Sequence, residues 1–313
     1  MDLEECLREN EIVLMEGALG ERLKREFRLP PHPTVALAAH IYQPEGREAL
    51  RLLWTEYAAI AARYGFPFLA TAPTRRANRE RAESAGYGEA LILDNTAFLQ
   101  GVRRDCGGAF FIGGLMGCRG DAYRGTEVLS VREAREFHRW QAALFARAGV
   151  DFLYAGIMPA LPEALGMAQA MGDTGLPYLI SLMLRRDGRL IDGTPLSRAI
   201  EQIDLGAGRR PLGYMTNCVH PDVLYEALSQ PFNRTPAVGE RFLGIQANTA
   251  ALPPEELDGR EELACSPPNR LAERMVRLRR DFGLRIFGGC CGTDGSHMEE
   301  LARRLANMKK EPS

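Results

Sequence analysis

Three cysteines in this sequence could bind one metal ion. Two of them, Cys290 and Cys291, are adjacent within the run GGCCGT at 288–293. Adjacent side chains on a regular strand point to opposite faces, but glycines permit backbone angles that could turn both thiolates toward one point. Cys218 would supply a third sulfur and leave one corner of a tetrahedron free. An open corner is typical of catalytic zinc, so these residues are candidate Zn2+ ligands.

The same cysteines allow two other interpretations. Cysteine is among the most buried residue types, so all three could be packing residues. Cys290 and Cys291 could instead form a redox disulfide. The chain has 7 cysteines, an odd number, and they are widely spaced, which favours reduced thiols in the cytoplasm over a secreted disulfide scaffold. Spacing alone leaves zinc ligation, packing and redox chemistry open.

Composition narrows the classes of partner. The 313 residues include 39 Lys and Arg against 41 Asp and Glu, giving a net charge of -2. This balance provides no field to attract nucleic acid or an anionic membrane. No apolar run approaches the roughly 18 residues of a membrane span, and the acidic N-terminus does not resemble a signal peptide. We therefore expect a cytoplasmic protein whose partners are small molecules, with neither nucleic acid nor membrane among them.

Eight short apolar runs recur along the chain, each followed by a longer helical pattern. They are apolar almost throughout, as expected for parallel strands that are buried on both faces. The runs lie at 11–15, 66–71, 109–115, 151–156, 177–183, 211–216, 241–247 and 284–289. This pattern predicts one α/β domain over residues 1–313, a single (β/α)8 TIM barrel. The alternative is an open doubly wound sheet, but no G-x-G-x-x-G follows the first run.

Three helical segments have clear boundaries, at 47–65, 130–149 and 296–308. The second begins after Ser130 and ends at Gly149, and in the third Ser296 and Glu299 have capping-box spacing, which places the helix start near His297. In a barrel, the loops at the carboxyl ends of the strands carry the chemistry. The candidate zinc ligands follow the sixth and eighth runs, so the fold should bring them together.

Several motifs resemble one known family. The GGCCGT run, the NC at 217–218 and the EGALG at 16–20 are similar to motifs of the zinc-dependent homocysteine S-methyltransferases, and TAPTRRAN at 71–78 is similar to that family's TNTFxAN loop. The resemblance covers nearly the whole chain. It implies that Zn2+ is held by Cys218, Cys290 and Cys291. It also implies in-line transfer of a methyl group to a thiol such as homocysteine, as in methionine biosynthesis.

The resemblance also implies substrate-binding positions. They are Glu16, Gly17, Thr74, Arg75, Arg76, Asn217 and Asn248. Glu16 stands where the family usually has an Asp that meets the amino group of homocysteine, although a helix N-terminal acid is an alternative. Thr74 corresponds to a position near the substrate carboxylate, or is an ordinary loop residue. Asn217 could fix its loop by hydrogen bonds or simply make a local turn.

The two arginines replace an aromatic and a small residue of the family loop. Arg75 and Arg76 are therefore candidates to contact an acidic group on the methyl donor or the acceptor, although a solvated helix start is the simpler interpretation. Two histidines lie near the cysteines. We expect His297 to have a capping or packing role and His220 to lie outside the metal site, because a fourth ligand would close it.

One departure from the family affects the acceptor. The chain has Ala155-Gly156 at the end of the fourth run, where the family has Glu-Thr. Ala155 in place of the Glu would remove a second contact to the homocysteine ammonium. The acceptor could then be a related thiol. The donor would be a small onium compound (S-methylmethionine, betaine or another sulfonium) or a methyl-corrinoid on a separate protein. A non-catalytic zinc-binding barrel and a Cys290/Cys291 redox protein are the alternatives, and the oligomeric state stays open.

Overall fold

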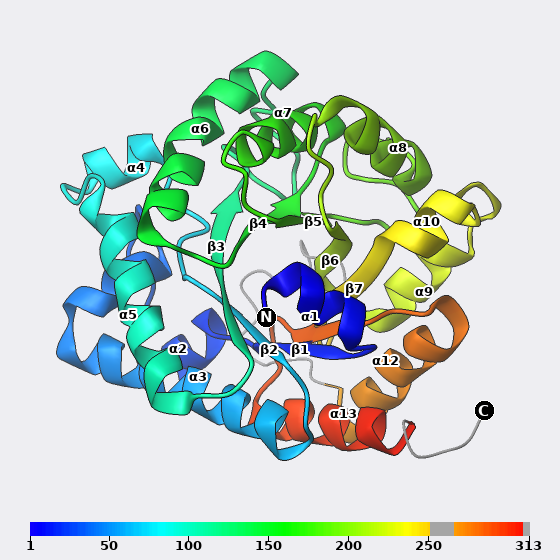
Figure 1. Ribbon diagram of the computed structural model, residues 1–313, viewed down its shortest axis with the longest axis horizontal. Helices are drawn as coiled ribbons and strands as arrows, with labels where there is room; N and C mark the ends of the chain where they lie inside the picture. Colours follow the sequence, from blue (N-terminus) through cyan, green and yellow to red (C-terminus); the bar gives the residue numbers. More distant parts are fainter. Residues whose placement is uncertain (251–265, 309–313) are drawn as a thin grey trace.

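Eight parallel strands close into a barrel in which each strand pairs with its neighbours in chain order, and β8 pairs with β1 (Figure 1). The computed structural model describes residues 1–250 and 266–308. The strands are β1 (Val13–Met15), β2 (Phe68–Thr71), β3 (Phe110–Gly117), β4 (Phe152–Met158), β5 (Tyr178–Leu182), β6 (Gly213–Val219), β7 (Phe242–Ala247) and β8 (Ile286–Gly289). Each lies at one of the eight predicted runs, so the predicted (β/α)8 barrel is confirmed.

Helices surround the barrel and alternate with its strands (Figure 1). Between β1 and β3 lie α2 (Gly20–Arg25), η1 (Leu37–Tyr42), α3 (Pro44–Arg63), α4 (Arg79–Ser84) and α5 (Ala90–Cys106). The next strands are joined by α6 (Val131–Ala148), α7 (Leu161–Gly172) and α8 (Leu196–Gly206). The remaining elements are α9 (Pro221–Ser229), η2 (Pro231–Asn233), α10 (Pro236–Arg241), α12 (Pro268–Phe282) and α13 (Gly295–Met308).

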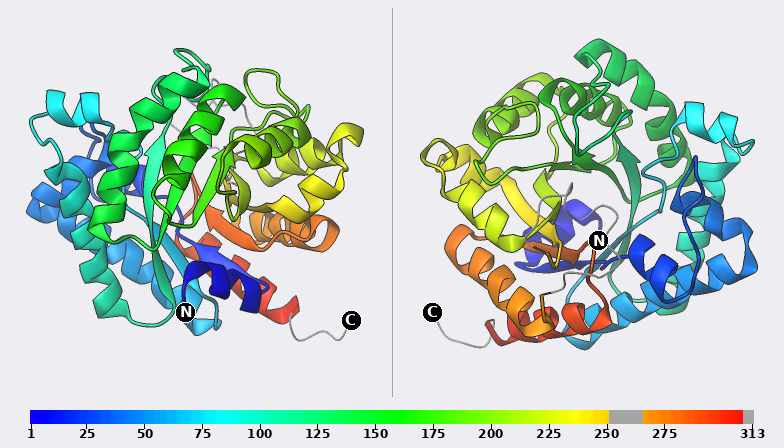
Figure 2. Two further views of the ribbon diagram at one scale, coloured as in Figure 1. Left: turned by 45° about the horizontal axis from the view of Figure 1, so that its top comes forward. Right: turned by 180° about the vertical axis from the view of Figure 1, so that it is seen from behind.

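A short helix, α1 (Leu3–Glu9), lies across the end of the barrel where the strands begin (Figures 1 and 2). It starts with a capping box between Asp2 and Glu5. Leu3 and Cys6 are fully buried and pack with Met15 and other side chains inside the barrel. This end is therefore filled with apolar side chains, and chemistry is left to the carboxyl ends of the strands.

The predicted helix boundaries are partly confirmed. Helix α6 has the expected capping box between Ser130 and Glu133, and it ends at Gly149 in the left-handed conformation, with φ 75°. The capping box predicted for α13 is wrong. The helix begins at Gly295, and the carboxylate of Asp294 accepts hydrogen bonds from the backbone N–H of His297 and the hydroxyl of Ser296. Because Asp294 supplies the acceptor, the helix starts before the Ser296 position.

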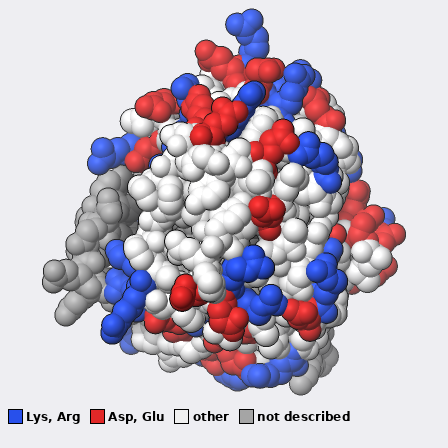
Figure 3. Space-filling model, turned by 90° about the vertical axis from the view of Figure 1, so that its left-hand side faces the viewer, with Lys and Arg blue, Asp and Glu red and all other residues white. Residues whose placement is uncertain are grey.

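The surface carries charges of both signs. On the face in Figure 3, acidic and basic side chains lie side by side around a central uncharged area, so this face has no continuous basic surface. No helix among the described residues is long and apolar enough to cross a membrane.

Candidate metal and substrate site

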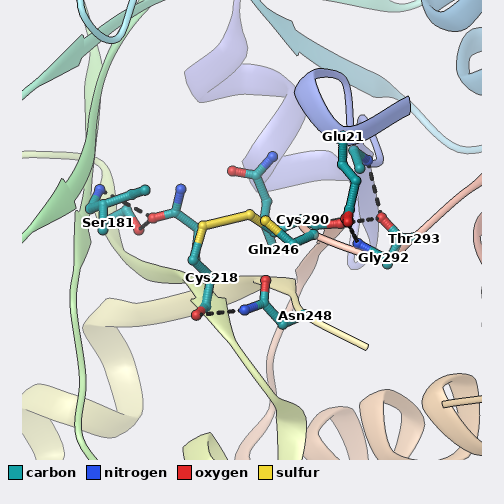
Figure 4. Close-up of a disulfide and its surroundings, with 12 residues drawn as sticks. Glu21, Ser181, Cys218, Gln246, Asn248, Cys290, Gly292 and Thr293 are labelled. Carbon is teal, nitrogen blue, oxygen red and sulfur yellow. Dashed lines mark hydrogen bonds between the residues drawn. A yellow bond between two sulfur atoms is a disulfide. The ribbon is translucent and has the colours of Figure 1, made fainter. Parts of the chain in front are cut away.

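The structure brings the three predicted cysteines together at the carboxyl end of the barrel. Cys218 lies near the end of β6, and Cys290 and Cys291 directly follow β8. Their sulfur atoms all lie within 4.8 Å of one another. Cys218 and Cys290 are joined as a disulfide (Figure 4). Cys291 is free. The alternative pairing of Cys290 with Cys291 is therefore not the one formed, because Cys290 turns toward β6 and Cys291 is exposed.

The three sulfurs lie close enough together to bind one metal ion once the disulfide is reduced. Zinc–sulfur bonds of about 2.3 Å place sulfur ligands about 3.8 Å apart, which is compatible with the observed 4.8 Å limit. Metal binding requires thiolates, so the bond between Cys218 and Cys290 must be reduced first. Three sulfur donors suit zinc, and the free fourth position would suit a substrate.

The loop after β8 is supported by residues that follow β1. The backbone N–H of Gly292 donates to the Glu21 carboxylate of α2, and Gly292 has φ 83°. The Thr293 hydroxyl donates to the Cys290 carbonyl at 2.7 Å and accepts from the Ala18 backbone N–H at 3.0 Å. As predicted, a glycine supplies the positive φ of this turn. These bonds fix the direction in which Cys290 and Cys291 leave the barrel.

On the other side of the site, two asparagines hold the end of β6. The Asn217 Oδ1 atom accepts from the backbone N–H of Ile157 at 3.1 Å and from the Ser181 hydroxyl, which links the ends of β4, β5 and β6. Asn248 Nδ2 donates to the Cys218 carbonyl at 2.9 Å (Figure 4). The expected loop-fixing hydrogen bonds of Asn217 are thus present.

The backbone of this region is unusual. Cys218 has φ 62° and Ile157 has φ 56°, and both lie where the strand register shifts. A left-handed conformation costs a non-glycine residue about 1–2 kcal/mol. The bonds from Asn217 and Asn248 stabilise this local backbone, which sets the direction of the Cys218 thiol.

Comparison with known proteins identifies the family. The model of the homocysteine S-methyltransferase family matches residues 13–305. The chain belongs to the homocysteine S-methyltransferase family. It is 25% identical over 198 residues to the homocysteine S-methyltransferase YbgG of Bacillus subtilis, covering 61% of this chain and 58% of that protein. It is 26% identical over 212 residues to the S-methylmethionine–homocysteine S-methyltransferase of Mus musculus, covering 64% and 56%. These matches span a little over half the length of each relative.

Solved structures share the fold. The homocysteine methyltransferase MmuM from Escherichia coli, in its oxidized form, matches with a TM-score of 0.76 and 21% identity, over 96% of this chain and 99% of that one. Its metallated form matches with a TM-score of 0.74 over the same shares of the two chains.

Glu16 is a buried carboxylate beside the barrel mouth of this homocysteine S-methyltransferase family member. It accepts hydrogen bonds from the backbone N–H and hydroxyl of Thr71 and from the Trp54 indole N–H at 2.8 Å. Burial raises the pKa of Glu16 to about 7, and the bonds from Thr71 and Trp54 oppose that rise. The next residue, Gly17, lies under the Tyr57 ring, where an added methyl group would approach ring atoms to 2.7 Å. Glycine is therefore the residue that fits there.

The loop after β2 carries the other predicted substrate residues. Thr74 is fully buried, and its hydroxyl donates to the Leu115 carbonyl at 2.8 Å, so it joins this loop to β3. Arg75 and Arg76 are half-buried. Neither forms an ion pair or a side-chain hydrogen bond within the described residues.

The two histidines lie outside the sulfur cluster, as expected. His297 uses both ring nitrogens, one with the Asp294 carboxylate at 2.8 Å and one with the Ser266 carbonyl at 3.0 Å. The ring of His220 accepts from the backbone N–H of Asp222 at the start of α9. Both rings therefore stabilise helix starts.

The structure shows which residue of the Ala155-Gly156 pair faces the barrel mouth. Ala155 packs in the layer between barrel and helices, whereas its neighbour Tyr154 lies inside the barrel. Gly156 has the same orientation as Tyr154, because a methyl group added to it would lie 2.7 Å from Leu115 Cδ1, which packs with the interior side chains. The residue that faces the barrel mouth is thus Gly156 and not Ala155.

Sequence reasoning missed two polar residues below the cysteines. The buried Tyr154 hydroxyl donates to Gln246 Oε1 at 3.0 Å across the barrel. The Gln246 side chain lies beside the disulfide in Figure 4. A glutamine in the otherwise apolar run RFLGIQA was the signal that could have identified this pair.

Proposed function

We propose that this protein is a zinc-dependent S-methyltransferase. It would transfer a methyl group from a small onium donor, such as S-methylmethionine, betaine or another sulfonium, to homocysteine or a related thiol. The observation that carries the proposal is the cluster of three cysteine sulfurs within 4.8 Å at the carboxyl end of a barrel of this family. Three donors hold a metal ion and leave a position for the acceptor thiol.

When bound, zinc supplies a position at which a thiol loses its proton at neutral pH and remains nucleophilic. Cys218, Cys290 and Cys291 would hold it and offset its charge. The acceptor sulfur then forms a bond to the methyl carbon while the bond from that carbon to the onium sulfur or nitrogen breaks. The electron pair stays on the leaving sulfide or amine, and the thiol proton passes to solvent. The products are a thioether and an uncharged leaving sulfur or nitrogen centre.

The chain's own residues would position the reactants. Where the acceptor carries an amino group, we assign that group to the Glu16 carboxylate, beside Gly17, because Glu16 is the family's acidic position after β1. We expect this contact to add little affinity, because Thr71 and Trp54 already donate to the carboxylate. Thr74 would shape the pocket through its bond to Leu115. Asn217 and Asn248 would act as positioning residues for Cys218, since their side chains fix its backbone.

Methyl transfer can be tested directly with the reduced, zinc-loaded protein. Homocysteine would be incubated with each onium donor carrying a 13C-labelled methyl group, and methionine would be followed by NMR. Labelled methionine from at least one donor is the expected result. Tight zinc binding without transfer from any onium donor or methyl-corrinoid would contradict the proposed reaction and favour a non-catalytic zinc-binding barrel.

Substitution of Asn248 should lower the zinc affinity, but less than loss of a cysteine ligand would. Its side-chain amide donates to the Cys218 carbonyl at 2.9 Å, so Asn248→Ala removes a bond that fixes a zinc ligand. Loss of such an outer partner typically lowers metal affinity by about ten- to a hundredfold. Competition with a chromophoric chelator would measure the change. Asn269→Ala, at an exposed position in α12, is the matched control and should leave the affinity unchanged.

A further inference from the structure

Arg75 extends over the ends of β3 and β4 at the mouth of the barrel. A methyl group added to Gly117 would lie 2.7 Å from Arg75 Cγ, and one added to Gly156 would lie 3.9 Å from Arg75 Cδ. Two glycines at the strand ends therefore make room for the stem of this arginine. The stem of Arg75 therefore runs past Gly117 to the neighbourhood of Gly156, the position that faces the barrel mouth.

The same region connects Arg75 with the sulfur cluster. Tyr123 follows β3, and desolvation raises its pKa to about 12, with Arg75 lowering the value and Cys291 raising it. Both groups thus lie within electrostatic range of the Tyr123 hydroxyl. Arg75 and Cys291 therefore belong to one part of the barrel mouth.

Arg75 is a half-buried cation that forms no ion pair within residues 1–250 and 266–308. Two acids of the rim have other partners. Glu21 accepts from the Gly292 backbone N–H and pairs with Arg25 at 3.2 Å. Asp121 accepts from the backbone N–H groups of Tyr123 and Arg124.

Two buried acids close to the site also have other partners, and of Glu163 only Oε1 is hydrogen-bonded within the described residues. Glu163 accepts from the Arg119 backbone N–H at 2.7 Å and lies 3.3 Å from the ring of His138. Glu16 is held by Thr71 and Trp54. The described mouth of the barrel therefore offers a cation without a partner, and Gly156 offers no side chain at all.

We infer that Arg75 makes this enzyme selective for acceptor thiols that carry an anionic group, of the mercapto-carboxylate class, whether or not they carry an ammonium group. The inference rests on the proposed entry of a thiol at the metal site. A carboxylate on the carbon chain of the thiol would pair with the Arg75 guanidinium. The ammonium would gain little, because Gly156 supplies no acid and Glu16 is already held by three donor groups.

Three acceptor thiols distinguish the contribution of the carboxylate to binding from that of the ammonium group. Homocysteine carries both groups, 4-mercaptobutyrate lacks the ammonium, and 3-aminopropane-1-thiol lacks the carboxylate. Calorimetric titration of the reduced, zinc-loaded protein would give each dissociation constant without requiring methyl transfer. We expect 4-mercaptobutyrate to bind within about threefold of homocysteine. We expect the aminothiol to bind about ten- to a hundredfold more weakly, which is the typical loss of one charge-assisted hydrogen bond.

Variants of Arg75 test whether its guanidinium is the group that binds the carboxylate of the thiol. Arg75→Ala should weaken the binding of both carboxylate-bearing thiols by that same factor and leave the binding of the aminothiol unchanged. Arg75→Lys should recover part of the lost affinity. Arg79→Ala is the control, since Arg79 is exposed and pairs with Glu83 in α4. Equal binding of the carboxylates by wild type and Arg75→Ala would overturn the inference. A changed KM for the donor alone would also overturn it.

The two proposals fail separately. Selective, Arg75-dependent thiol binding without methyl transfer from any donor would contradict the proposed reaction and support the role of Arg75. Methyl transfer to homocysteine that is insensitive to Arg75→Ala would contradict only the role of Arg75. Absence of binding by all three thiols would overturn both.

Discussion

A Cys290→Ser variant is expected to lose its bound zinc and, with it, methyl transfer. A serine hydroxyl does not ionise at neutral pH, so the site would keep two sulfur donors of three. Loss of an outer partner of a metal ligand already costs up to about a hundredfold in affinity, and loss of a ligand should cost more. Metal analysis after dialysis and the 13C methyl-transfer assay would measure both effects. Cys106→Ser, at the end of α5 and remote in sequence from the cluster, is the control.

Cys291→Ser separates zinc chemistry from redox chemistry. In the structure Cys291 is free, and the disulfide joins Cys218 to Cys290. A redox protein that uses this disulfide would keep its activity without Cys291. A zinc enzyme would lose metal and activity in the variants of all three cysteines. Equimolar zinc and a wild-type rate in Cys291→Ser would therefore contradict the three-sulfur site.

Glu16 should make the stability of the protein depend on pH. Burial raises the folded-state pKa to about 7, above the ordinary value of 4.5. Between these values the folded state holds a proton that the unfolded state has released, so the free energy of unfolding falls as pH rises. The stabilisation is complete below pH 4.5 and is lost as the pH approaches 7. A difference of about 2.5 units corresponds to about 3 kcal/mol.

Urea unfolding of the metal-free, reduced protein at several values from pH 4.5 to 7.5 would measure this effect. Glu16→Gln removes the titration, so the wild-type unfolding free energy should fall relative to the variant by about 3 kcal/mol across this range. Any lost hydrogen bond in the variant adds a constant that does not change with pH. Glu48→Gln, at an exposed position in α3, should follow the wild type. Parallel curves for wild type and Glu16→Gln would contradict the prediction.

The sequence predicts the barrel because its strands are apolar on both faces and alternate with helices. That same feature hides which face of a strand points inward. Phe152 and Tyr154 line the interior, whereas Leu153 and Ala155 face the helices, and all four residues fit either environment. The resemblance to the family assigned the missing acidic group to Ala155, whereas the packing around Leu115 shows that Gly156 is the residue that faces the barrel mouth.

The cysteine cluster is predictable because glycine-rich loops at neighbouring strand ends meet in a barrel. The relative positions of the three sulfurs are not predictable from the sequence. The direction of the Cys218 thiol depends on a positive φ that a cysteine rarely adopts, and that backbone is held by Asn217 and Asn248 from different strands. The pairing of Cys218 with Cys290 follows from this geometry.

The central claim is that three cysteine sulfurs bind zinc and that a thiol becomes the fourth ligand. Zinc-edge X-ray absorption on the reduced protein, with and without homocysteine, measures the sulfur count directly. We predict three sulfurs in the free protein and four when homocysteine or 4-mercaptobutyrate is present. Zinc with fewer than three sulfur ligands, or a count that no thiol changes, would contradict the account.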